Sequence, residues 1–107
     1  MAVMDLERHQ ETLFAVDQPM VVEACAVDGG GLVELTVESA TQPITVDGWT
    51  SCSVRLVGRS GAQVRTPGLH HVYHQGRAFN ITLTRLARRG SLVAYAAFLL
   101  EPVRQFA

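Results

Sequence analysis

The sequence predicts an all-β protein, a single antiparallel β-sandwich of the jelly-roll or Greek-key kind over residues 1–107. Three observations predict it. Apolar and polar residues alternate with period two in several segments. Turn-forming residues such as Asp-Gly, Pro-Gly and Gln-Gly recur between those segments. Helical periodicity is nearly absent from the chain.

The elements follow in order from the N-terminus. Residues 1–19 are expected to form an N-terminal arm or a short helix, together with the first strand. The strands are predicted over 12–16, 20–27, 31–39, 43–47, 50–57, 62–66, 69–74, 77–86 and 91–100. The link Asp28-Gly-Gly-Gly31 is short enough to make a hairpin of the strands on either side of it.

The clearest alternation lies in the segment 31–39. Val33, Leu35 and Val37 alternate there with polar neighbours. Such a strand has one face in the core and one in water. The segments 50–57 and 77–86 repeat the pattern.

The last predicted strand, 91–100, breaks this pattern because it is apolar on both faces. A strand of this kind must be covered on both sides, by the same chain or by another subunit. Little chain is left over to cover it, so we expect oligomerisation. The residues predicted to form the interface are Leu92, Val93, Tyr95, Phe98 and Leu99.

The composition indicates one folded domain, with 48% hydrophobic and 18% charged residues in 107. The net charge of −1 hides an asymmetry. Residues 1–50 hold one arginine and nine acids (1 − 9 = −8), and residues 51–107 hold eight arginines and one acid (8 − 1 = +7). If the halves form separate faces, they could pair between subunits; if the strands interleave, the charges cancel within one molecule.

A basic face on the later strands would favour nucleic acid as the partner. Few aromatic residues accompany those arginines to stack on bases, and the whole chain is slightly acidic. We therefore expect a homo-oligomer or a protein partner and no nucleic acid. The residues of the predicted basic face are Arg77, Arg85, Arg88 and Arg89.

Three histidines, His70, His71 and His74, stand close together in the sequence. On a strand, His70 and His74 share a face but lie about 13 Å apart, whereas zinc sits about 2 Å from each nitrogen ligand. His71 points to the opposite face. We therefore expect surface or interface histidines, with these three as weak metal candidates and no cofactor.

No catalytic set stands out. The serines lack a G-x-S-x-G context. Cys52 shares its face with Val54 and Leu56, so it is expected in the core. The sequence leaves open whether Cys25 and Cys52 form a disulfide.

The chain is expected neither to be exported nor to enter a membrane. Its longest apolar run, Leu92 to Leu100, is nine residues, and charged residues stand where a signal peptide would be apolar. We expect it in the cytoplasm or within a particle assembled there.

The function expected from these observations is that of a non-catalytic structural or protein-interaction subunit. It would assemble with itself or decorate a larger assembly, for example as a ring, shell or virion-surface component. Two alternatives stay open: a small cupin-like barrel that binds a metal or small ligand through the histidines at 70–74, and a nucleic-acid-binding module that uses the arginine face.

Overall fold

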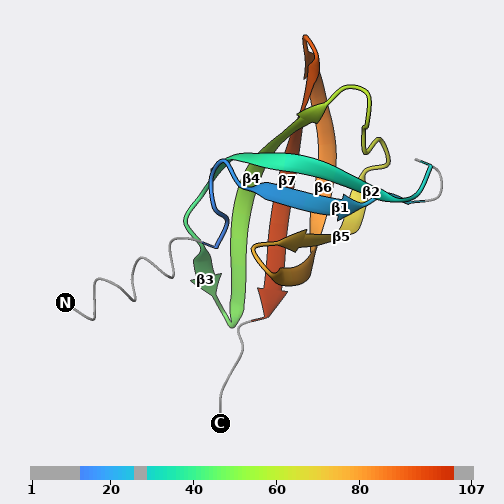
Figure 1. Ribbon diagram of the computed structural model, residues 1–107. Coiled ribbons are helices and arrows are strands. Elements are labelled where there is room, and N and C mark those ends of the chain that lie inside the picture. Colours follow the sequence, from blue (N-terminus) through green and yellow to red (C-terminus); the bar gives the residue numbers. More distant parts are fainter. Residues whose placement is uncertain (1–12, 26–28, 103–107) are drawn as a thin grey trace.

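A computed structural model describes residues 13–25 and 29–102, and seven strands run through this part of the chain (Figure 1). All paired strands are antiparallel, and the described residues contain no helix. The predicted all-β antiparallel fold is therefore confirmed. The strands are β1 (Pro19–Glu23), β2 (Leu32–Ala40), β3 (Ile44–Val46), β4 (Trp49–Arg59), β5 (Gly68–His74), β6 (Arg77–Arg89) and β7 (Leu92–Pro102).

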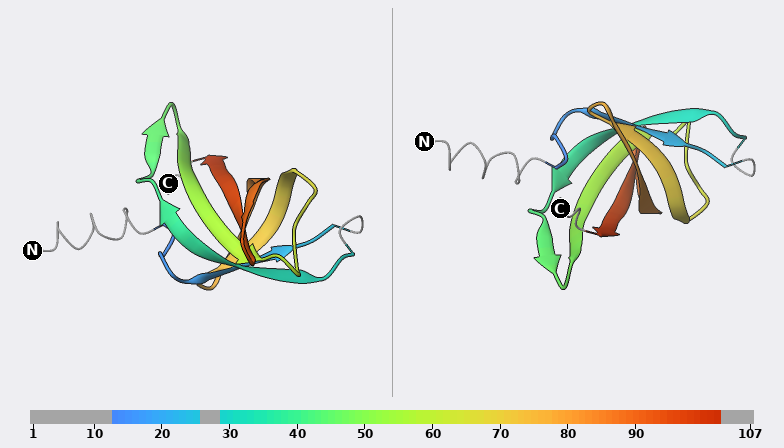
Figure 2. Two further views of the ribbon diagram at one scale, coloured as in Figure 1. Left: turned by 90° about the horizontal axis from the view of Figure 1, so that it is seen from above. Right: turned by 90° about the horizontal axis from the view of Figure 1, so that it is seen from below.

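The sheet closes on itself (Figure 2). Strand β2 pairs with β1 on one side and with β4 on the other, so six strands form a barrel in the order β1-β2-β4-β7-β6-β5. Strand β3 pairs only with β4 and stands outside the ring. The sandwich is thus not confirmed. Sandwiches and barrels share the same inside–outside alternation, so the pattern could not separate them.

Gly58 lies at the seam where β2 and β4 close the barrel. A side-chain carbon at this position would collide with the Leu35 side chain, and both residues are buried. The register of β2 against β4 also shifts between Val37 and Ser39, a β-bulge that bends the strand. A missing side chain and a bulge together allow the two strands to meet.

Two tight hairpins follow the predicted turn chemistry. Asp47 and Gly48 have φ of 51° and 81° between the paired residues Val46 and Trp49. Gln75-Gly76 repeats this geometry between β5 and β6, with φ of 51° and 76°. Positive φ at both central residues defines the type I′ turn, which fits the twist of antiparallel strands.

The interior of the barrel is filled by alternate side chains of its six strands. The largest fully buried ones are Tyr95, Met20, Leu35, Leu56, Ile81, Leu83 and Leu99. Each apolar side chain of this size contributes about 1.5–3 kcal/mol when it leaves water. No described buried side-chain nitrogen or oxygen lacks a hydrogen-bond partner.

Two predicted strands are wrong. Neither the described part of 12–16 nor the segment 62–66 contains a strand. Their apolar residues instead pack against the core from loops, with Phe14 and Val64 both buried. The backbone N–H of Val64 donates to the Tyr95 hydroxyl at 3.1 Å. The predicted N-terminal arm or helix falls on residues 1–12, outside the described residues.

Candidate protein-interaction surface

The last strand has one covered face and one exposed face. The side chains of Val93, Tyr95 and Leu99 fill the barrel interior, so the chain covers this side of β7 itself. Leu92 and Phe98 point outward and are exposed. Of the predicted interface residues, only these two can therefore reach a partner. The other three are core residues of this chain.

The exposed side of β7 continues onto β4 and β3. Residues paired directly across a sheet share a face, and the register places Val46 beside Trp49 and Ile44 beside Ser51, which in turn pairs with Leu100. These large apolar side chains are between 44% and 60% exposed. We call this set the outer apolar face: Ile44, Val46, Trp49, Phe98 and Leu100.

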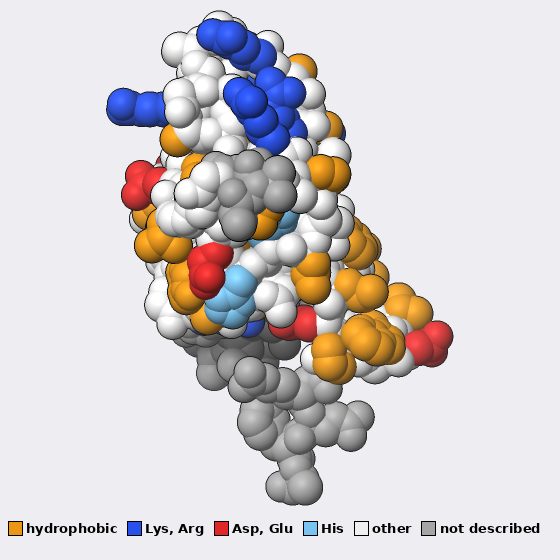
Figure 3. Space-filling model, turned by 90° about the vertical axis from the view of Figure 1, so that its right-hand side faces the viewer, with side chains coloured by type: hydrophobic (Ala, Val, Ile, Leu, Met, Phe, Trp, Pro, Cys, Tyr) orange, Lys and Arg blue, Asp and Glu red, His pale blue; other side chains and the backbone are white. Residues whose placement is uncertain are grey.

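The β3–β4 hairpin carries much of this face away from the barrel. Figure 2 shows β3 standing apart from the ring of strands. Figure 3 shows hydrophobic side chains gathered on the part of the molecule that projects at the lower right. A contiguous apolar surface on a projecting hairpin is accessible to a partner protein. Single exposed apolar residues scattered over a surface carry no such meaning.

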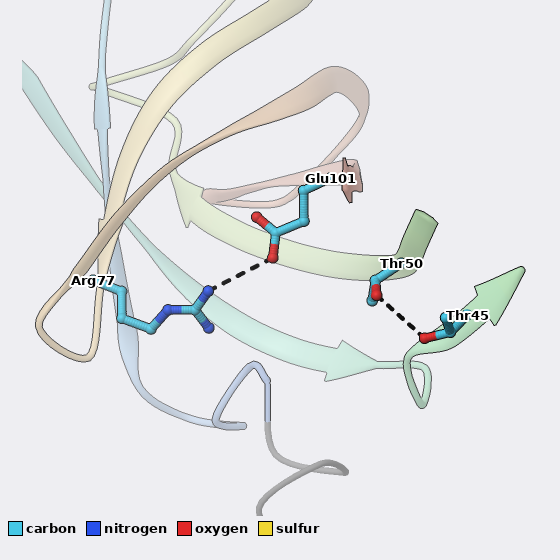
Figure 4. A network of polar contacts seen from close by, with 4 residues as sticks. All are labelled: Thr45, Thr50, Arg77 and Glu101. Carbon is cyan, nitrogen blue, oxygen red and sulfur yellow. Dashed lines mark hydrogen bonds and ion pairs between the residues drawn. The ribbon is translucent and has the colours of Figure 1, made fainter. Parts of the chain in front are cut away.

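The reverse side of the same hairpin is polar (Figure 4). The hydroxyls of Thr45 and Thr50 lie 3.2 Å apart. Arg77 reaches from β6 toward Glu101, with Nη2 3.7 Å from Oε1. The hairpin is thus amphipathic, and its apolar side faces away from the barrel mouth.

A groove of about 500 Å³ crosses the middle of β4 and β7, where it adjoins the outer apolar face at Phe98. The groove has room because β7 carries the small Ala96 there, next to the larger Phe98. Arg55 lies on the groove and has no ion pair among the described residues. The remaining lining residues are Ser39, Ala40, Thr41, Ser53, Val54, Thr82, Thr84 and Ala97.

The predicted basic face is divided between the two ends of β6. Arg77 begins the strand, and Arg85 lies roughly 26 Å further along it. Arg85 donates to the Gln63 side chain at 2.8 Å and Arg88 to the Gly90 carbonyl at 3.0 Å. On the face seen in Figure 3, most of the basic side chains gather at the top.

The acidic and basic halves of the chain interleave in the barrel. Strand β2, from the acidic half, pairs with β4 from the basic half. Arg89 also forms an ion pair with Glu38 at 3.1 Å. Part of the charge asymmetry is therefore cancelled within one molecule.

The three histidines alternate across β5 as the spacing predicts, but two of them are not at the surface. His70 and His74 are only 6% and 3% exposed. His70 Nδ1 lies 3.0 Å from the Gly68 carbonyl. Two buried rings, roughly 13 Å apart along a strand, give no shared ligand site, and the expectation of surface histidines was wrong for both.

His71 is the exposed histidine, and it belongs to a polar cluster on the outer side of β5. Its Nδ1 lies 2.9 Å from the Asn80 side-chain oxygen, and its ring meets Tyr73 edge-on at 5.1 Å. The Tyr73 hydroxyl donates to the Glu23 carboxylate. That hydrogen bond, with the charge of Glu23, raises the pKa of Tyr73. Sequence reasoning missed this cluster because Glu23 lies 50 residues away.

Burial and a hydrogen bond reduce the reactivity of Cys52. Cys25 and Cys52 are not joined by a disulfide. The Cys52 thiol is buried, as predicted, and donates to the Thr41 carbonyl at 3.0 Å. Burial raises the pKa of Cys52, against a smaller lowering by the Thr41 side chain. A raised pKa leaves less of the reactive thiolate.

No group of three histidine, cysteine or acidic side chains within residues 13–25 and 29–102 could hold a metal ion. The same ranges contain no helix with the length and apolar character to cross a membrane. Comparison of the chain with protein-family models, curated proteins and solved structures finds no match.

Proposed function

We propose that this chain is a non-catalytic structural or protein-interaction subunit that joins a larger assembly through the outer apolar face. One observation carries the proposal: five large apolar side chains are exposed together over β3, β4 and β7. Monomeric proteins rarely leave large contiguous apolar patches in water, and such patches mark contact sites. A ring, shell or virion-surface component, in the cytoplasm or in a particle assembled there, has this property.

The outer apolar face is too small to hold two proteins together without further contacts. Five side chains that are each about half exposed would contribute about 5 kcal/mol when covered, and association costs about 4–15 kcal/mol in lost freedom. The apolar contact alone is therefore marginal. Polar contacts at its margin, or repetition of the contact around a closed assembly, would make it stable.

Both alternative functions have less support from the geometry. A ligand-binding barrel would need histidines in an open cavity, whereas His70 and His74 lie in the packed core and bond to the backbone. For the nucleic-acid module, Arg85, Arg88 and Arg89 each already make a hydrogen bond within the chain. These three arginines are therefore partly engaged within the chain.

The substitution Phe98→Asp tests the proposal. A carboxylate on the outer apolar face should disperse the assembly, because a buried charge without a partner is costly. Leu32→Asp is the matched control, since Leu32 is also exposed, at the start of β2 and off this face. Sedimentation velocity would report size, and circular dichroism would confirm the fold.

We expect an oligomeric wild type, a dispersed but folded Phe98→Asp variant, and a Leu32→Asp variant that assembles normally. The proposal would be overturned by an oligomer that Phe98→Asp leaves intact. It would equally be overturned by a wild type that is monomeric up to millimolar concentration and whose solubility does not respond to Phe98→Asp.

A further inference from the structure

The outer apolar face is bulky at one end and hollow at the other. Trp49 stands at the end that carries the hairpin, and the groove beside Phe98, Ala96 and Arg55 begins where the face ends, at the middle of β4 and β7. Arg55 follows Trp49 by six positions on β4, which is roughly 20 Å along a strand. A projecting side chain and a hollow on one surface are the two parts of a self-complementary contact.

We infer that the partner of this face is a second copy of the same chain, paired through a two-fold axis with Trp49 of each copy seated in the groove of the other. The pairing presupposes the proposed function, since both use the outer apolar face. The axis would lie between the two faces and run across their strands.

The strand register shows which residues such an axis brings together. Outward rows follow one another along β4 and β7: Trp49 with Pro102, Ser51 with Leu100, Ser53 with Phe98, and Arg55 with Ala96. An axis between the second and third rows lays the first row of one copy over the fourth row of the other. Leu100 then meets Phe98, and Trp49 meets Arg55 and Ala96.

Charge favours this orientation of the two copies. Asp47 lies at the tip of the hairpin, beyond Trp49, and Arg55 lies on the groove, past the other end of the face. Neither has an ion pair among the described residues. The antiparallel arrangement brings each Asp47 to the partner's Arg55 end, and Arg55 can also stack on the Trp49 indole.

Trp49 and Arg55 are also the residue types expected to supply much of the binding energy. Tryptophan and arginine are enriched among the residues that dominate binding energy, and they act by filling pockets. The groove volume, about 500 Å³, falls within the range of pockets that hold ligands of drug size. Alanine at position 96 leaves that space open.

Trp49 is the only tryptophan of the chain and therefore reports on its own contact. We expect its fluorescence to shift to the blue, and its quenching by iodide to fall, as wild-type protein is concentrated through the dimerisation range. Ala96→Leu fills the groove and should abolish both changes. Leu32→Asp is the control that should retain them.

A double-mutant cycle tests the charges. Asp47→Asn retains the Asx-Gly turn, and Arg55→Gln removes the opposing charge. Each should weaken dimerisation by about tenfold, since the symmetric contact occurs twice, and the double variant should lose no more than either single variant. Additive losses, or no loss, would overturn the pairing.

The outcomes separate the pairing from the proposed function. An assembly that Phe98→Asp disperses, but which is not dimeric or leaves Trp49 open to iodide, refutes the pairing and supports the function. A monomeric wild type that is indifferent to Phe98→Asp refutes both.

Discussion

His74 Nε2 accepts a hydrogen bond from the backbone N–H of Ala15 at 3.0 Å, while His74 Nδ1 lies 2.8 Å from the carbonyl oxygen of Pro19. A backbone N–H can only donate and a carbonyl can only accept, so the proton of the neutral ring lies on Nδ1. The ring also packs against Phe14 at 5.8 Å between centroids. This buried histidine therefore ties the segment before β1 to the barrel.

The substitution His74→Phe should destabilise the fold by about 3 kcal/mol, because it leaves the Ala15 N–H and the Pro19 carbonyl without their partner. His71→Phe is the control on the same strand. His71 is exposed, so its replacement should change stability by less than about 0.5 kcal/mol. Urea unfolding would measure both, and equal stabilities would contradict a structural role for His74.

Gly58→Ala should destabilise the barrel by about 1–3 kcal/mol, because the new methyl group would collide with Leu35 at the β2–β4 seam. Adding Leu35→Ala should relieve the collision, so the double variant should lose less than the sum of the single losses. Gly61→Ala is the control, since nothing lies within 4 Å of a side-chain carbon there. Strictly additive losses in thermal unfolding would show that the seam is not closed at Gly58.

The sequence predicts the positions of the strands better than it predicts that the strands close into a barrel. Alternation located most of them, and Asp47-Gly48 and Gln75-Gly76 marked two hairpins correctly. The contact between β2 and β4 depends on the bulge near Ser39 and on space at Gly58. Neither feature changes the period-two pattern, so a barrel could not be distinguished from a sandwich.

Loops explain the two false strands. Phe14 and Val64 are apolar and buried, as strand residues would be. The backbone N–H groups in these loops donate to side chains instead of a neighbouring strand: that of Ala15 to His74 Nε2, and that of Val64 to the Tyr95 hydroxyl. The pattern of apolar residues in a short segment indicates which side chains are buried. It does not show whether a buried side chain belongs to a loop or to a strand.

The candidate surface was predicted only in part. The doubly apolar 91–100 segment indicated a face in need of cover, and Phe98 and Leu92 are exposed on it. The contribution of Ile44, Val46 and Trp49 could not be found, because it depends on the pairing of β4 with the distant β7. Cross-strand neighbours far apart in sequence leave no local signal.

Tyr95→Phe should cost about 1–2 kcal/mol, since it removes the acceptor of the buried Val64 N–H and leaves that group unsatisfied. Amide exchange at Val64 should accelerate relative to the β-strand amides, which distinguishes this local loss from a general one. Tyr73→Phe, at an exposed tyrosine, is the matched control. Unchanged exchange at Val64 would show that the hydroxyl does not hold the 62–66 loop.

The phenol of Tyr73 should titrate above its ordinary value of 10.0, because its hydrogen bond to Glu23 and the charge of that carboxylate both raise its pKa. A raised folded-state pKa means that the stabilising contribution of this bond is fully present below pH 10.0 and is lost as the pH rises through the raised pKa. Glu23→Gln removes the charge and should bring the transition back toward the ordinary value. Ultraviolet absorbance of the phenolate would follow the titration of Tyr73. The Tyr73→Phe variant would show which part of the absorbance change comes from this tyrosine and which from the buried Tyr95. A Tyr73 transition that does not move in Glu23→Gln would show that the phenol and the carboxylate do not interact in solution.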